Sequence, residues 1–401
     1  MPSRRDFLGR TAWAGATLGA ARFLGWTTGS ALAATRLDTL THTAPNARFW
    51  TSLQKAGANC GACHATAPKA GAKHTHPAGL VQCLLCAQRC AIPPGERGRC
   101  RARINVGGEL KSLVYGRPVS IHVDPIEKKP FYHFLPGVTA LSFGTAGCPL
   151  RCQFCQNWEL SQSAPEDHDV EFVAPARIAE SATAQGTPVI AFTYDEPTVF
   201  TEYLLDVAAA ARPRGVRSVL VSCGFMNEAP LAEMCDALAA IKIDLKGFSE
   251  DFYHQVSGAA LAPVLRSIKQ IHKRGVHLEI VNLVIPTLND AEPLLTGLAD
   301  WLMSELGPDV PIHFTRFHPD YKLLNLPPTP VATLERARDI AMAKGIQYVY
   351  VGNVPGHPGN DTYCPQCRQV VIRRTAFFVV ENRITNGRCR NCQHKIAGVW
   401  S

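Results

Sequence analysis

Three cysteines in a short glycine-containing stretch carry the strongest chemical signal of this sequence. Cys148, Cys152 and Cys155 follow an apolar run and are spaced Cys-x3-Cys-x2-Cys. Three thiolates can bind three irons of a four-iron cluster and leave the fourth iron without a protein ligand. Such an open position lets a metal centre bind a small molecule, rather than only relay electrons. The spacing predicts a [4Fe-4S] cluster; half of a zinc site and a disulfide framework are the alternatives.

The chain around these cysteines alternates regularly between apolar, β-branched runs and helix-like segments. The runs predict strands at residues 140–143, 189–194, 218–222, 240–245, 277–285, 312–317 and 347–351. The segments between them predict helices at residues 175–185, 198–212, 228–239, 261–274, 291–306 and 329–344. Alternation of this kind is typical of βα units around a parallel sheet. The predicted fold class is α/β, an incomplete (β/α)6-type parallel barrel, with a doubly wound sheet as the alternative.

Polar side chains recur where the predicted strands end. They are Tyr194, Asp195 and Glu196 after the second strand, Ser222 after the third, Asp244 and Lys246 at the fourth, and Asn282 at the fifth. In both candidate architectures the active site lies at the carboxyl ends of the strands. Each residue alone can serve as a helix cap or turn, but together they predict a binding site beside the three-cysteine loop.

The Cys-x3-Cys-x2-Cys spacing resembles the signature of the radical S-adenosylmethionine (SAM) enzymes. In that family the open iron holds the amino and carboxylate groups of SAM, and electron transfer releases a 5′-deoxyadenosyl radical. An amine needs an acceptor and a carboxylate needs a cation. We therefore expect Glu196, with Asp195, to accept from the amine and Lys246 to meet the carboxylate.

Further motifs extend the resemblance over residues 81–400. They include Cys90-Ala-Ile-Pro, Val123-Asp-Pro-Ile-Glu-Lys-Lys-Pro-Phe, Cys155-Gln-Asn-Trp-Glu-Leu-Ser-Gln, Asp244-Leu-Lys-Gly and Tyr350-Val-Gly-Asn-Val-Pro-Gly. The chain resembles the radical SAM component of the AmmeMemoRadiSam system, which is similar to pyruvate formate-lyase activases. The resemblance implies a SAM-dependent radical reaction on an unspecified substrate, a low-potential electron donor, and Memo-type and AMMECR-type partner proteins.

Two further cysteine groups predict additional metal sites. Cys83, Cys86, Cys90 and Cys100 have a spacing that suits an auxiliary iron–sulfur cluster or zinc, with disulfides as the alternative. Cys364, Cys367, Cys389 and Cys392 form paired knuckles that resemble a zinc ribbon or a rubredoxin-like iron site. Four thiolates close the coordination shell of one ion, so the second group is expected to be structural or to relay electrons.

The N-terminal region predicts export. Ser3-Arg4-Arg5-Asp6-Phe7-Leu8 is a twin-arginine pattern, followed by an apolar stretch and an Ala-x-Ala cleavage pattern ending at Ala33. Cys60, Cys63 and His64 form a Cys-x2-Cys-His motif, which predicts c-type haem; an accidental pattern in a linker, a disulfide and a loose metal chelate are the alternatives. These features predict a periplasmic protein, with a cytoplasmic location as the alternative. They also leave open a second function, an exported electron-transfer protein with several metal centres.

Composition and domain order complete the expectations. The 401 residues carry a net charge of +8, and Lys and Arg are scattered, so no nucleic-acid partner is predicted. No stretch beyond the signal is long and apolar enough for a membrane span. The expected divisions are a signal peptide (1–34), a linker (35–80), a four-cysteine segment (81–136), a radical SAM core (137–353) and a four-cysteine ribbon (354–401).

Overall fold

The computed structural model describes residues 35–53 and 78–401. The predicted signal peptide and the Cys60, Cys63 and His64 motif lie outside the described residues. Within the described ranges, no helix has the length and apolar character needed to cross a bilayer. The thirteen cysteines of these ranges are all free thiols, so none of them forms a disulfide.

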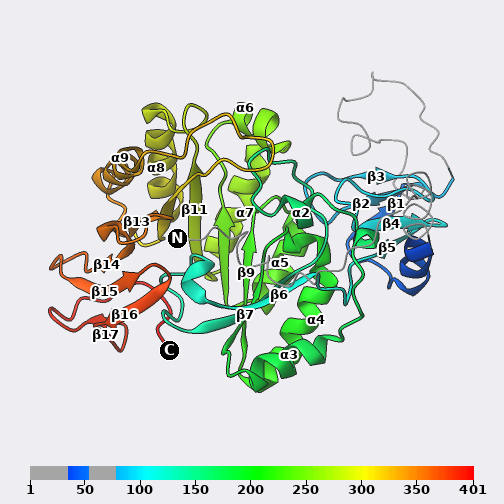
Figure 1. The fold of residues 1–401 in the computed structure, drawn as a ribbon, viewed down its shortest axis with the longest axis horizontal. Coiled ribbons are helices and arrows are strands. Elements are labelled where there is room, and N and C mark those ends of the chain that lie inside the picture. Colours follow the sequence, from blue (N-terminus) through cyan, green and yellow to red (C-terminus); the bar gives the residue numbers. More distant parts are fainter. Residues whose placement is uncertain (1–34, 54–77) are drawn as a thin grey trace, which may run out of the picture.

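The core of the molecule is an eight-stranded sheet in the order β13-β12-β11-β10-β9-β8-β7-β6 (Figure 1). Seven neighbouring strands run parallel: β7 (Thr139–Gly144), β8 (Val189–Phe192), β9 (Arg217–Ser222), β10 (Ala240–Asp244), β11 (His277–Val284), β12 (Ile312–Arg316) and β13 (Val349–Gly352). The antiparallel strand β6 (Ser120–Pro125) forms one edge and β13 the other, so the barrel is incomplete. The predicted α/β parallel barrel is confirmed.

Six helices connect the parallel strands, close to the predicted bounds. They are α3 (Pro175–Ala184), α4 (Thr201–Ala211), α5 (Glu228–Ala237), α7 (Leu261–Lys273), α8 (Glu292–Leu306) and α9 (Val331–Ala343). In α7 the buried residues Leu261, Val264, Ile268 and Ile271 recur at helical spacing and face the sheet. All four residues of β8 are buried, because side chains on one face fill the barrel and those on the other meet helices. All seven parallel strands therefore deliver their loops to one rim.

An N-terminal segment packs against this rim. Residues 35–43 are helical, and β1 (Trp50–Ser52) pairs antiparallel with β2 (Val81–Cys83), which pairs with β3 (Ala91–Ile92). A hairpin of β4 (Arg103–Val106) and β5 (Glu109–Ser112) follows. Part of the predicted linker is thus ordered structure of this segment. The amide of Asn227 donates to the carbonyl oxygen of Cys86 at 2.9 Å, which joins the segment to the loop after β9.

A C-terminal module lies beside β13 (Figure 1). It consists of the sheet β14 (Thr362–Tyr363), β15 (Val370–Thr375) and β16 (Phe378–Asn382), and the hairpin β17 (Ile384–Thr385) and β18 (Arg388–Cys389). The Arg374 guanidinium is buried, donates to the carbonyl oxygen of Tyr132 at 2.8 Å and stacks 4.0 Å above that ring. Glu279, near the start of β11, accepts from the backbone amides of Tyr132 and His133. These contacts fix the module against the segment after β6 and the start of β11.

Candidate functional site

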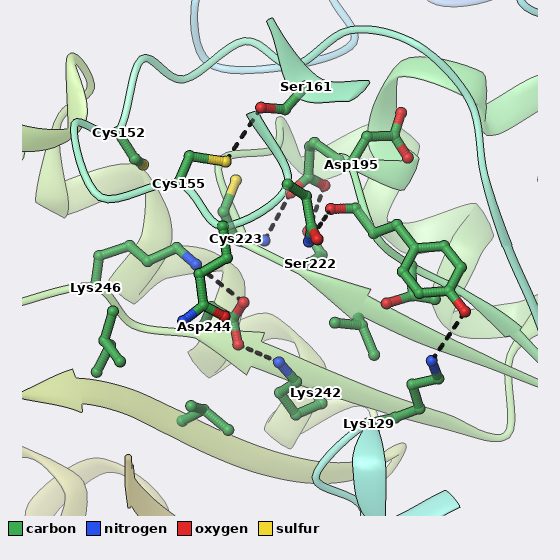
Figure 2. A pocket seen from close by; sticks show the side chains of 18 of the residues that line it. Lys129, Cys152, Cys155, Ser161, Asp195, Ser222, Cys223, Lys242, Asp244 and Lys246 are labelled. Carbon is green, nitrogen blue, oxygen red and sulfur yellow. Dashed lines mark hydrogen bonds and ion pairs between the residues drawn. The ribbon is translucent and has the colours of Figure 1, made fainter. Parts of the chain in front are cut away.

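One large pocket opens at the carboxyl ends of the parallel strands and encloses about 1400 Å³, its open mouth included. Figure 2 shows charged, hydroxyl and thiol side chains directed into it. Nine of the ten residues predicted as catalytic or cofactor-binding line this pocket: Cys148, Cys152, Cys155, Tyr194, Asp195, Glu196, Ser222, Asp244 and Lys246. The structure therefore brings together residues from four different strand-end loops.

Asn282 is the tenth residue, and the structure places it outside the pocket. Successive side chains of a strand point to opposite faces. Val281 and Leu283 line the pocket, so Asn282 between them faces away. Its amide donates to the carbonyl oxygen of Leu245 at 2.8 Å, and its side chain is 2 % exposed. Asn282 thus joins β11 to the end of β10, and the prediction that it contacts the cofactor has no support in this arrangement.

The three-cysteine loop follows β7 and is shaped by Gly147. This glycine has φ +100°, and a Cβ at this position would lie 2.3 Å from the carbonyl oxygen of Cys100. The loop then turns all three thiols toward the pocket, where the Cys155 Sγ lies 3.2 Å from the Ser161 Oγ. Burial raises the pKa of Cys152 to about 11, although the nearby Lys246 opposes this shift. A bound metal deprotonates such thiols, because the cation stabilises the thiolate.

The spacing of the sulfur atoms fits a cluster better than a single ion. In the described ranges, only the C-terminal cysteines bring three or more metal-ligand atoms all within 4.8 Å of one another. The sulfur atoms of Cys148, Cys152 and Cys155 therefore span more than that. Thiolates bound to different irons of one cluster lie farther apart than thiolates bound to one ion, so the donor set and its spread fit an iron–sulfur cluster.

The two carboxyl groups after β8 differ in their surroundings. Glu196 accepts from the hydroxyls of Ser222 and Thr198, both at 2.6 Å, and from the Cys223 amide at 2.7 Å. It therefore ties the loop after β8 to the end of β9. Asp195 accepts from the Thr145 amide and hydroxyl, at 3.2 and 3.1 Å. Burial raises the pKa of Asp195 well above its usual value, so a bound cation would restore its charge.

Asp244 lies between two lysines in the pocket (Figure 2). One of its carboxylate oxygens pairs with the ammonium of Lys242, and the other pairs with that of Lys246 at 2.9 Å. Burial alone would raise the pKa of Asp244, but the two ammonium groups lower it to about 2. Burial would lower the pKa of Lys246, but Asp244 raises it. The cluster carries one net positive charge, which suits an anionic ligand group.

A second charged cluster lines the pocket on the β6 side. Lys129 pairs with Asp124 at 2.6 Å, and its ammonium lies 4.4 Å from the centroid of the Tyr194 ring. The Tyr194 hydroxyl donates to Asp124 at 2.9 Å. Tyr194 has φ +75°, a strained conformation for a residue with a Cβ, and this turn directs its ring across the pocket wall.

The sequence analysis did not predict several residues that line the pocket, although sequence patterns pointed to some of them. Lys242 precedes Asp244 by two positions on a strand, a spacing that places both side chains on one face. Lys128 and Lys129 belong to a motif that was noted only for its resemblance to other proteins. Ser161, at the end of α2 (Trp158–Ser161), belongs to another of these motifs. Phe377 had no such signal, because the β15–β16 turn reaches the pocket only through tertiary packing.

The C-terminal cysteines form a compact four-sulfur group. The Sγ atoms of Cys364 and Cys392 lie 3.6 Å apart, and those of Cys367 and Cys389 lie 3.8 Å apart. A metal–sulfur distance of about 2.3 Å in a tetrahedron places the sulfurs about 3.8 Å from one another. The predicted second metal site is thus supported, with the geometry of a single zinc or iron ion.

The N-terminal cysteines Cys83, Cys86, Cys90 and Cys100 surround a small buried cavity. They do not form a set with all ligand atoms within 4.8 Å, in contrast to the C-terminal group. Arg103, whose side chain is 1 % exposed, lines the same cavity and pairs with Glu202. The structure therefore gathers all four thiols predicted to share this site.

The protein has three thiols at the strand ends of an incomplete parallel barrel. Comparison with known proteins identifies the class of protein that has this fold and site. The model of the radical SAM superfamily matches residues 143–296. An uncharacterized protein, MJ0808, from Methanocaldococcus jannaschii is 42% identical over 318 residues, which cover 79% of this chain and 95% of that protein. The chain belongs to the radical SAM superfamily and is a radical SAM enzyme of the pyruvate formate-lyase activase-like type.

More distant relatives have assigned names. The pyruvate formate-lyase-activating enzyme of Listeria monocytogenes is 24% identical over 178 residues, which cover 42% of this chain and 71% of that enzyme. Among solved structures, Streptococcus suis SuiB bound to S-adenosylmethionine has a TM-score of 0.41 and 12% identity, covering 57% of this chain and 53% of that one. QueE from Escherichia coli has a TM-score of 0.38 and 13% identity, covering 59% of this chain and 93% of that one.

Proposed function

We propose that this enzyme binds a [4Fe-4S] cluster through Cys148, Cys152 and Cys155 and cleaves SAM reductively in the pocket at the strand ends. The single observation that carries the proposal is the convergence of these three thiols, two acidic residues and the Lys242–Asp244–Lys246 cluster on one pocket. When bound, the cluster supplies one electron to SAM, and the resulting 5′-deoxyadenosyl radical removes hydrogen from a substrate.

The pocket residues divide the binding of SAM among them. Lys246 binds the carboxylate, because its charge lies near Cys152 and Asp244 orients it at 2.9 Å. Asp195 accepts from the amine, because it lines the pocket and its hydrogen bonds to Thr145, at 3.2 and 3.1 Å, are longer than the shortest of those that Glu196 accepts. Glu196 acts as a positioning residue, since its oxygens already accept from Ser222, Thr198 and Cys223. This refines the prediction that Glu196 meets the amine directly.

The finer assignment is to the radical SAM component of the AmmeMemoRadiSam system, supported by the motifs that extend over residues 81–400. We propose Memo-type and AMMECR-type proteins as partners and a low-potential one-electron donor as the reductant. The twin-arginine pattern supports export to the periplasm, with the cytoplasm as the alternative. Cell fractionation with an antibody to the chain tests the location, and a processed form in the periplasmic fraction is expected.

The decisive experiment is anaerobic reconstitution followed by a SAM cleavage assay. Reduced wild-type protein should release 5′-deoxyadenosine, measured by mass spectrometry. Cys155→Ala should release none, because one iron loses its thiolate. Cys235→Ala is the matched control, since Cys235 is a buried cysteine outside the pocket and should keep wild-type turnover. Absence of 5′-deoxyadenosine from a wild-type protein with a full cluster would refute the proposal.

The alternative function is electron transfer through several metal centres, and the two further four-cysteine groups favour it. The cluster would then have lost its reaction with SAM. The two functions differ in one measurement, the paramagnetic resonance spectrum of the reduced protein. SAM should change the spectrum of an enzyme that binds it at the open iron, and it should leave the spectrum of a pure electron carrier unchanged.

A further inference from the structure

Cys83, Cys86, Cys90 and Cys100 line a cavity together with a buried arginine that has one unpaired N–H group. The Arg103 side chain lines this cavity, and its Nε has no hydrogen-bond partner although it is buried. The two terminal nitrogens of Arg103 donate to the Arg48 carbonyl oxygen and to Glu202. A buried N–H group without a partner is costly, so an acceptor bound in the cavity would stabilise Arg103.

Two observations distinguish this group from the C-terminal one. The C-terminal sulfurs already have the spacing of one tetrahedral ion, with pairs at 3.6 and 3.8 Å. The N-terminal sulfurs surround a cavity and do not reach that spacing. A cluster fills the space between more widely separated thiolates, and its sulfides accept hydrogen bonds from N–H groups such as the Arg103 Nε.

The N-terminal cavity shares a wall with the catalytic pocket. Cys148 lines the pocket, and the next residue, Pro149, lines the cavity. Glu196 lines the pocket, and Thr198 and Val199 lie on the cavity side. The carbonyl oxygen of Pro149 accepts from the Gln88 amide at 3.1 Å, so the wall is held together directly. The two groups of cysteines therefore lie on either side of a wall formed by consecutive residues, as a relay between their centres requires.

We propose that Cys83, Cys86, Cys90 and Cys100 hold a second iron–sulfur cluster, which passes electrons to the centre held by Cys148, Cys152 and Cys155. The role of this second cluster as an electron donor rests on the proposed function, but its presence at the four cysteines does not. One electron leaves the reduced auxiliary cluster for the oxidised centre in the pocket, and no bond is formed or broken at the auxiliary cluster. A low-potential one-electron donor then reduces the auxiliary cluster again.

The surface around this site fits an acidic donor protein. Arg89, Arg99 and Arg101 are exposed, and each lies next to one of the cysteines Cys90 and Cys100 in the chain. Arg99 also lines the cavity. A patch of like charge steers an oppositely charged partner, and the attraction weakens as the salt concentration rises.

The metal is tested first on the wild-type protein, reconstituted anaerobically with iron and sulfide. We expect about eight irons per chain in two four-iron clusters, in addition to the single C-terminal ion. The paramagnetic spectrum should contain two signals, of which SAM changes only one. Cys90→Ala should lose the signal that SAM does not change, and Cys235→Ala should retain both. Zinc at this site, or only one cluster in the wild-type protein, would overturn the inference whether or not the variant folds.

The electron route is tested by the rate of reduction of the SAM-responsive signal. With reduced flavodoxin as the donor, Cys90→Ala should be slower than wild type by roughly tenfold or more, whereas dithionite can enter the open pocket and should act on both alike. Equal rates with flavodoxin would overturn the relay. Two clusters without 5′-deoxyadenosine release would refute the proposed function and leave the auxiliary cluster standing. Release of 5′-deoxyadenosine with zinc at the N-terminal site would support the proposed function and refute the auxiliary cluster.

Discussion

Replacement of Asp244 by asparagine tests the charge arrangement at the centre of the pocket. Asp244 pairs with Lys242 and Lys246, and asparagine keeps its shape while removing its charge. The side chain of Lys242 is only 4% exposed. Without Asp244, Lys242 becomes a buried ammonium without a counter-ion, and Lys246 loses the group that orients it toward the pocket.

The structure sets the size of the effect. The pKa of Asp244 falls from 3.8 to about 2, because the two ammonium groups outweigh burial. A shift of this size corresponds to about 2 kcal/mol in favour of the charged carboxylate. Breaking a buried ion pair from one side costs about 3–5 kcal/mol, and Lys242 can relieve part of that cost by losing its proton. We therefore expect Asp244→Asn to lower the free energy of unfolding by about 2–3 kcal/mol.

The assay is thermal unfolding of the metal-free protein at pH 7, combined with measurement of SAM affinity on the reconstituted protein. A loss of this size should lower the unfolding midpoint by roughly 2–4 °C in a chain of this length. The double variant Asp244→Asn/Lys242→Met should regain much of that loss, because an apolar side chain needs no counter-ion. Both variants should bind SAM more weakly than wild type. A single variant as stable as wild type, or a double variant no more stable than the single one, would refute this reasoning.

Three further predictions concern other parts of the molecule. Burial lowers the pKa of His133 to about 3, so as the pH falls below 6.5 this histidine takes up a proton in the unfolded chain before it does so in the folded one. The free energy of unfolding should therefore drop by about 2 kcal/mol between pH 6.5 and 5. This part of the pH dependence of stability should vanish in His133→Gln. Cys389→Ser should lose the C-terminal ion, seen as one metal fewer per chain, and should speed proteolysis of residues 354–401, with Cys235→Ser as the control that changes neither. Gly147→Ala should prevent cluster assembly, seen as loss of the SAM-responsive signal, because its Cβ would lie 2.3 Å from the Cys100 carbonyl oxygen; normal iron content in this variant would contradict the shape inferred for the loop.

Much of the barrel could be predicted from the sequence because its strands and helices are local patterns. Helix α7 was expected at residues 261–274 and spans Leu261–Lys273, since its apolar side chains repeat at helical spacing. The antiparallel edge strand β6 was not predicted. Three of its residues are exposed and only Asp124 is buried, so its sequence lacks the apolar run that marks the inner strands.

The pocket was predictable for a different reason, which is that parallel strands bring their carboxyl ends to one rim. That rule correctly gathered Asp195, Ser222 and Lys246, although they lie far apart in the chain. It does not say which way a side chain points, and the structure places Asn282 outside the pocket that the others line. The alternation of side chains along β11 excludes Asn282 once the inward position of Val281 is known.

The distinction between the two four-cysteine groups required three-dimensional information. Both have four thiols, and tetrathiolate sites serve zinc and iron alike, so spacing in the chain leaves the metal open. The distances between sulfurs separate them: the C-terminal group already has the dimensions of one ion, whereas the N-terminal group leaves a cavity with an unpaired Arg103 N–H. The same geometry explains their positions. A closed single-ion site can stabilise the module that Arg374 anchors to Tyr132, while a redox cluster has to lie close to the pocket, as the adjacent residues Cys148 and Pro149 indicate.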